Sequence, residues 1–110
     1  MQVRVTNIER TLIDIVVRPA YSGGVAEVLK AFERAREQAS VNRLMALLQK
    51  LNYLYPYHQA IGFYLERAGY SGTALDFIRQ MPLNYDFYLA HQMGATDYVP
   101  QWRLHIPKGF

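Results

Sequence analysis

Apolar residues recur at helical spacing through most of the first 80 residues. Apolar side chains three and four residues apart fall on one face of a helix, so this spacing predicts amphipathic helices. Local signals bound them: Pro19 ends the first, Ser40 is suited to cap the third, and Gly69 lies where the fourth needs a left-handed residue. The pattern predicts four to five helices, over about residues 8–18, 25–38, 41–51, 57–68 and 73–78.

The start of the first helix carries a more specific signal. Thr6 stands three residues before Glu9, which is the spacing of a capping box. In that arrangement the Thr6 hydroxyl accepts from the Glu9 backbone N–H, and the Glu9 carboxylate accepts from that of Thr6. Arg10 precedes Asp14 by four residues, so we also expect an ion pair along the helix.

The pattern changes after Pro82. Aromatic residues dominate residues 85–89, and apolar and polar residues alternate over 102–106, as is typical of strands. A third short alternation lies near residues 2–5. The connection from Ala90 to Gln101 contains Gly94 and Pro100 and is expected to be a loop. The predicted fold class is α+β: four to five helices with a small C-terminal β-sheet, with strands near 2–5, 85–89 and 102–106.

Length and composition limit the choice of function. A chain of 110 residues, half of them hydrophobic, is expected to form a single domain over 1–110. It has no cysteine, which excludes a disulfide framework, a zinc ribbon and a thiol nucleophile. No apolar run approaches the length of a membrane helix, and no secretory signal is visible at the start. We therefore expect a protein of the cytoplasm that has no contact with membrane.

Catalytic motifs are weak. The three histidines, His58, His91 and His105, show no metal-ligand spacing, and ordinary surface or hydrogen-bonded histidines are the simpler interpretation. Ser22 and Ser71 lie in turn sequences rather than in a nucleophile elbow. Neither a phosphate-binding glycine loop nor a pair of carboxylates at useful spacing occurs. We predict no catalytic residues, no cofactor, no metal and no enzymatic activity.

The net charge of +3 lies entirely in residues 1–50, which carry eight basic and five acidic side chains. The outer positions of the third predicted helix include Arg43 and Lys50, two turns apart with no acid between them, and Arg34 and Arg36 lie just upstream. These four side chains are a candidate surface for weak, non-specific contact with DNA phosphates. Such a row of cations is more often a face that only keeps a helix soluble.

Aromatic residues crowd the next stretch. Six of them, with His58 in their midst, lie between residues 53 and 70: Tyr53, Tyr55, Tyr57, Phe63, Tyr64 and Tyr70. Aromatics with cations can stack nucleic-acid bases, but Arg67 is the only cation in 51–78. Packing in the core or against a partner is therefore favoured over base stacking.

Three segments resemble the C-terminal domain of AbiEi-type antitoxins, the antitoxin and regulator half of type IV toxin–antitoxin (abortive infection) systems. They run from Val5 to Pro19, from Tyr21 to Phe32 and from Tyr55 to Gly69. The most specific piece is Glu9-Arg10-Thr11-Leu12-Ile13-Asp14, similar to a run that opens the family's domain. The helix from Gly62 to Gly69, ending in Glu-Arg-Ala-Gly, is the second marker.

The resemblance implies a cytoplasmic phage-defence antitoxin that represses its own operon and counteracts a nucleotidyltransferase-like toxin. The family's DNA contacts belong to a winged helix that would precede Thr6, and this chain has none there, so no DNA-reading residue is carried over. Whether the chain is a fragment or a stand-alone antitoxin domain stays open, as do self-association and the mode of neutralisation. The alternative is a generic protein-interaction module of another bacterial regulator.

Overall fold

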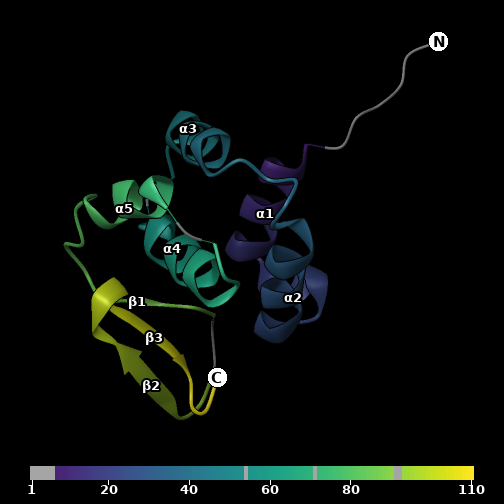
Figure 1. The fold of residues 1–110 in the computed structure, drawn as a ribbon. Helices are drawn as coiled ribbons and strands as arrows, with labels where there is room; N and C mark the ends of the chain where they lie inside the picture. Colours follow the sequence, from purple (N-terminus) through teal and green to yellow (C-terminus); the bar gives the residue numbers. More distant parts are fainter. Residues whose placement is uncertain (1–6, 54, 71, 91–92) are drawn as a thin grey trace.

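The computed structural model describes residues 7–53, 55–70, 72–90 and 93–110. Within them, five α-helices precede a three-stranded sheet (Figure 1), which confirms the α+β class. The elements are α1 (Ile8–Val17), α2 (Val25–Ala35), α3 (Val41–Leu51), α4 (Tyr57–Arg67), α5 (Thr73–Arg79), β1 (Phe87–Tyr88), β2 (Thr96–Val99) and β3 (Leu104–Pro107).

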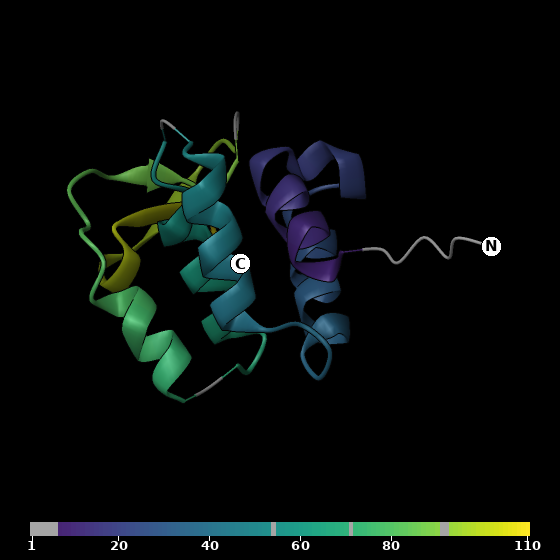
Figure 2. The same ribbon diagram turned by 90° about the horizontal axis from the view of Figure 1, so that it is seen from above.

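Helix α4 forms the centre of the core. Every residue from Gln59 to Leu65 is buried, so this helix is enclosed on nearly all sides rather than along one face. It contacts α1, α2, α5 and the start of the sheet. Seen from above, α1 and α2 lie on one side of the molecule and the sheet on the other (Figure 2). A helix that neighbours cover on both sides needs apolar or small residues all round, and α4 provides them.

The segment that leads into β3 packs against α4 at Gly62. Trp102 lies in a short 3₁₀ turn, Pro100–Trp102, and is fully buried against this glycine. A methyl group at position 62 would overlap the indole ring. The indole N–H donates to the Glu66 carboxylate at 3.0 Å, which satisfies the polar atom of an otherwise apolar contact. Glycine here is therefore a packing requirement between helix and sheet.

The strand order is β1-β3-β2, with β1 parallel and β2 antiparallel to β3. Strands β1 and β3 confirm the predictions near 85–89 and 102–106, although β3 begins later because residues 100–102 form the 3₁₀ turn. The expected loop from Ala90 to Gln101 is wrong in part, because 96–99 pair with β3. The segment between Gly94 and Pro100 is too short for its sequence to predict a strand without knowledge of its pairing with β3. The strand predicted near 2–5 lies outside the described residues.

The first helix begins one residue later than a capping box at Thr6 requires. Its cap is Asn7, whose side chain accepts from the Arg10 backbone N–H at 3.0 Å. The Glu9 carboxylate accepts from the backbone N–H of Ser40, 31 residues away, at 2.8 Å. The predicted pair between Arg10 and Asp14 is confirmed at 3.1 Å. Thr6 itself lies outside the described residues.

Candidate binding surfaces

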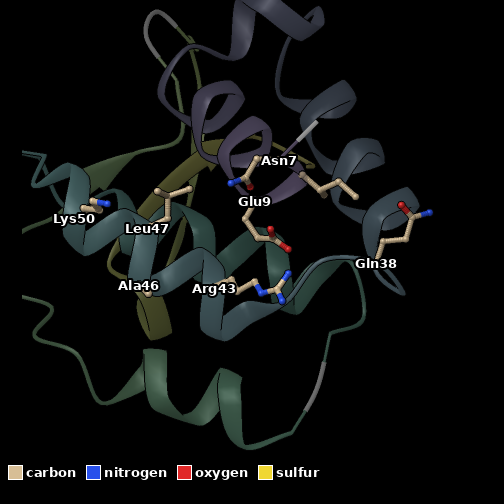
Figure 3. A pocket seen from close by; sticks show the side chains of 8 residues that line it. Asn7, Glu9, Gln38, Arg43, Ala46, Leu47 and Lys50 are labelled. Carbon is tan, nitrogen blue, oxygen red and sulfur yellow. The ribbon is translucent and has the colours of Figure 1, made fainter. Parts of the chain in front are cut away.

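A hollow of about 610 Å³ lies between the start of α1 and the outer face of α3 (Figure 3). We call it the α1–α3 hollow. It is lined by Asn7, Ile8, Glu9, Gln38, Arg43, Ala46, Leu47 and Lys50. The Ser40 side chain caps α3 by accepting from the Arg43 backbone N–H at 3.2 Å, as the sequence predicted. This cap fixes the start of α3 and so places the helix's outer face along the hollow.

Two of the four predicted cations, Arg43 and Lys50, line the α1–α3 hollow. The other two, although described, do not. Arg36 reaches from the end of α2 to the carbonyl of Ala68, to which it donates at 3.2 Å, and so helps cap α4. Arg34 stands exposed in the last turn of α2. Of the predicted group of four, only Arg43 and Lys50 therefore line the hollow.

The α1–α3 hollow also contains a carboxylate. Glu9 is only 7% exposed, and it binds the Ser40 N–H at the start of α3, where the helix dipole favours a negative charge. Figure 3 shows Glu9 and Arg43 pointing toward one another across the hollow. The outer face of α3 is basic when read alone, but its positive potential is reduced by an acid that α1 supplies.

A second surface is built from aromatic rings at the ends of α1 and α4 and the edge of the sheet. We call it the tyrosine surface and define it by Arg18, Tyr21, Tyr53, Tyr55, Tyr57, Phe87 and Tyr88. It contains two hollows, of about 360 and 210 Å³, which share Tyr55 and Tyr57. Val16, Val17, Pro19, Phe87 and Tyr88 complete most of the larger hollow. Leu48, Gln49, Asn52, Tyr53, His58 and Met81 complete the smaller one.

The rings of the tyrosine surface hold one another in place. Tyr57 meets Tyr53 edge-to-face, with ring centroids 5.1 Å apart, and meets Phe87 in the same way at 5.4 Å. Edge-to-face pairs at these distances are favourable beyond the area they bury. Burial raises the pKa of the Tyr57 hydroxyl, and the neighbouring Tyr53 and Tyr55 add to the rise. Tyr55 remains 59% exposed, and its ring is stacked beside Phe87 with centroids 6.4 Å apart, so a large part of this ring is open to solvent.

Arg18 supplies the cation of this surface. It lies between Val17 and Pro19, which line the larger hollow, and its guanidinium donates to the Tyr21 hydroxyl at 2.6 Å. That hydrogen bond raises the pKa of Arg18, with smaller contributions from Tyr53 and Tyr57. Within the described residues, no carboxylate lies within ion-pair distance of Arg18. The site is hard to recognise in the sequence because Tyr53, Tyr55 and Tyr57 lie 35 or more residues after Arg18.

The aromatic character continues across the outer face of the sheet. Tyr88, His105 and Tyr98 stand side by side on β1, β3 and β2, because the strand register pairs each outer ring with His105. The Tyr88 and His105 rings are stacked 4.5 Å apart. Tyr98 donates to Asp86 at 2.7 Å, and this bond, together with one from Arg103 at 3.1 Å, lowers the pKa of Asp86.

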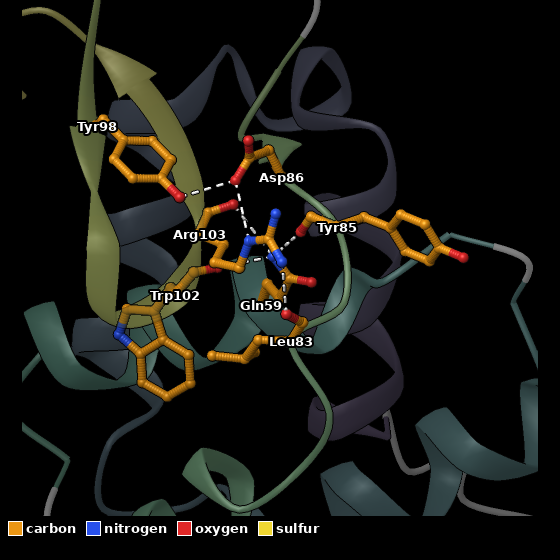
Figure 4. A network of polar contacts seen from close by, with 7 residues as sticks. All are labelled: Gln59, Leu83, Tyr85, Asp86, Tyr98, Trp102 and Arg103. Atoms are coloured by element: carbon orange, nitrogen blue, oxygen red, sulfur yellow. Dashed lines mark hydrogen bonds and ion pairs between the residues drawn. The ribbon is translucent and has the colours of Figure 1, made fainter.

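Beneath that face, a polar network joins the sheet to α4 (Figure 4). The buried Gln59 amide donates to the carbonyls of Trp102 at 2.7 Å and Tyr85 at 3.0 Å. Arg103, held in a left-handed conformation with φ of 48°, donates to the Leu83 carbonyl at 3.0 Å. These groups satisfy backbone carbonyls at the helix–sheet junction, so the network is structural.

The histidines occupy separate environments. The Nε2 atom of His58 is 2.7 Å from the Pro82 carbonyl, His105 belongs to the aromatic row, and His91 lies outside the described residues. Among the positions that the structure describes, no three His, Asp or Glu side chains are grouped so as to hold a metal ion. No helix within the described ranges has the length and apolarity needed to cross a bilayer. Comparisons with models of known protein families, with curated proteins and with solved structures gave no significant match.

Proposed function

We propose that this chain is a non-enzymatic antitoxin and regulator domain of the type IV (abortive infection) class. In this role it counteracts a nucleotidyltransferase-like toxin in the cytoplasm and assists repression of its operon. The observation that carries the proposal is a difference in how acidic side chains and the tyrosines and cations are used. Four of its nine carboxylates make contacts within the fold, whereas its open surfaces present tyrosines and cations.

The carboxylates illustrate this division. Each of four is engaged in a contact that fixes an element: Glu9 with Ser40, Asp14 with Arg10, Glu66 with Trp102, and Asp86 with Tyr98 and Arg103. Exposed tyrosines and arginines, in contrast, are the residue types enriched where proteins contact other macromolecules. This distribution favours a binding domain over an acid–base enzyme.

The segment Glu9–Asp14, which most closely resembles the antitoxin family, has a structural role. Glu9 anchors the start of α3, while Leu12 and Ile13 are buried in the core. Arg10 and Asp14 pair on the outside of the helix. The residues that carry the resemblance therefore build the helical core of this chain and mark no binding site.

Co-expression tests the proposal. The chain is produced together with the product of a neighbouring gene that encodes a nucleotidyltransferase-like protein, and growth is compared with that of cells expressing the toxin and an empty vector. We expect growth to be restored. The matched control is a core-disrupting variant, Leu12→Asp, which should fold poorly and fail to rescue. Continued growth arrest despite abundant, folded parent protein would contradict the antitoxin role.

A further inference from the structure

The tyrosine surface combines features to which the antitoxin proposal assigns no particular ligand. Two hollows share the exposed Tyr55 and the half-buried Tyr57, and Arg18, which has no carboxylate partner in the described chain, lies between two residues that line the larger hollow. We infer that this surface binds single-stranded RNA, with unpaired bases seated in the two hollows and Arg18 on a phosphate. The inference is independent of the antitoxin proposal.

The arrangement of the rings favours bases. Every nucleobase has a flat π-face, and stacking on aromatic side chains is the common means of holding unpaired strands. Tyr57 is fixed by its edge-to-face neighbours, and Tyr55 presents an exposed ring beside it. Because both hollows are lined by Tyr55 and Tyr57, neighbouring bases of one strand can enter them in turn. A duplex, whose bases are already stacked and paired, cannot.

The charge favours a phosphodiester backbone. A guanidinium carries several N–H donors, so the single bond from Arg18 to Tyr21 leaves others for phosphate oxygens. The Tyr21 hydroxyl is bound to Arg18, and Tyr53 and Tyr57 lie in edge-to-face contact on the same surface. Phenol hydroxyls both donate and accept, as does the ribose 2′-hydroxyl, which distinguishes RNA from DNA. Phosphate, base and sugar each therefore find a complementary group.

Fluorescence anisotropy with a labelled 12-nucleotide RNA of mixed sequence tests the inference on the full chain. We expect saturable binding that is at least threefold tighter than to DNA of the same sequence and much tighter than to duplex RNA. Tyr55→Ala should raise Kd roughly 5- to 100-fold, the range for losing one stacked base. Arg18→Gln should weaken binding and reduce the slope of log Kd against log salt by about 0.7, the value for one phosphate contact with a single strand.

Two matched variants separate the roles of ring and charge. Tyr55→Phe keeps the ring and should stay within about twofold of the parent, as expected for stacking. Arg34→Gln removes an equally exposed cation from α2 and should leave the salt slope unchanged. Circular dichroism should show all four variants folded, because the altered side chains are exposed. Equal binding to RNA, DNA and duplex, unchanged binding by Tyr55→Ala, or no RNA binding at all would overturn the inference; the last result would assign the surface to a protein partner.

Discussion

The α1–α3 hollow and the tyrosine surface differ in the charge that neighbouring elements bring to them. The α1–α3 hollow is lined by the cations Arg43 and Lys50 of α3 and by the carboxylate of Glu9 from α1. The Glu9 side chain points toward Arg43 (Figure 3). The tyrosine surface consists mainly of neutral aromatic rings, and Arg18, at the end of α1, adds a positive charge to it. One helix thus makes the first surface less basic and the second more basic. The net charge of a surface depends on every element that contributes side chains to it. Counting the charges along one helix therefore gives the wrong charge for the surface.

The largest expected effect is on the free energy of unfolding. It concerns the packing of the sheet against α4, which positions part of the tyrosine surface but not the α1–α3 hollow. Phe87 and Tyr88 depend on the docking of the sheet against Gly62 of α4. Gly62→Ala places a methyl group inside the buried Trp102 ring, an overpacking cost of about 1–3 kcal/mol. Alanine gains roughly 1 kcal/mol in helix propensity, which offsets part of this cost. We expect unfolding in urea to show a net loss of up to about 2 kcal/mol.

A double-mutant cycle provides the control for this prediction. In a Trp102→Phe background the smaller ring leaves room for the methyl group, so Gly62→Ala should cost clearly less there than in the parent. Equal costs in the two backgrounds would contradict the proposed overlap, and the loss would then have another origin.

The second prediction removes the acid from the α1–α3 hollow. Glu9→Gln keeps a hydrogen-bond acceptor for the Ser40 N–H but loses the charge that favours the start of α3. We expect about 0.5–1 kcal/mol of destabilisation in chemical denaturation. Affinity for DNA should rise, because the carboxylate no longer opposes Arg43. Glu33→Gln, on the exposed face of α2, is the matched control and should change stability by less than about 0.5 kcal/mol.

The third prediction concerns the sheet beside the tyrosine surface. Hydrogen bonds from Tyr98 and Arg103 lower the pKa of Asp86 below its usual 3.8. A lowered pKa means that the folded state favours the carboxylate, so this group stabilises the protein above the unfolded value and the contribution is lost as pH falls through the folded pKa. The parent should therefore lose more stability below about pH 4 than Asp86→Asn does. Melting temperatures that fall equally with pH in the two proteins would contradict the assignment of this pH dependence to Asp86.

The smallest effect on stability is expected for the cations of the hollow. Exchanging Arg43 and Lys50 together for glutamine changes only exposed side chains, so the free energy of unfolding should move by less than about 0.5 kcal/mol. If the hollow contacts DNA, it acts through phosphates, with a Kd of roughly 10⁻⁴–10⁻⁶ M at physiological salt. The double variant should bind every DNA sequence more weakly and reduce the salt slope by about one to two. Binding identical to that of the parent would leave these cations a solubilising role.

Local sequence signals predicted most of the helical half of this fold. Pro19 prevents α1 from continuing, Ser40 caps α3, and Gly69 takes a φ of 92° just after α4. Each signal acts within a few residues of the chain, through a missing N–H, a side-chain acceptor or a permitted backbone angle. Strand β2 was missed because four residues between Gly94 and Pro100 become a strand only when β3 supplies their hydrogen bonds.

The sequence by itself determined the α+β class, the helices and the excess of positive charge in the first 50 residues. Only the tertiary structure decided that Glu9 binds the start of α3, that Arg36 binds the Ala68 carbonyl at the end of α4, and that Arg18 stands among the tyrosines. The physical reason is range. Helix periodicity and capping depend on neighbours a few residues away, whereas a long charged side chain pairs with whichever donor or acceptor the packing of the helices brings within about 3 Å.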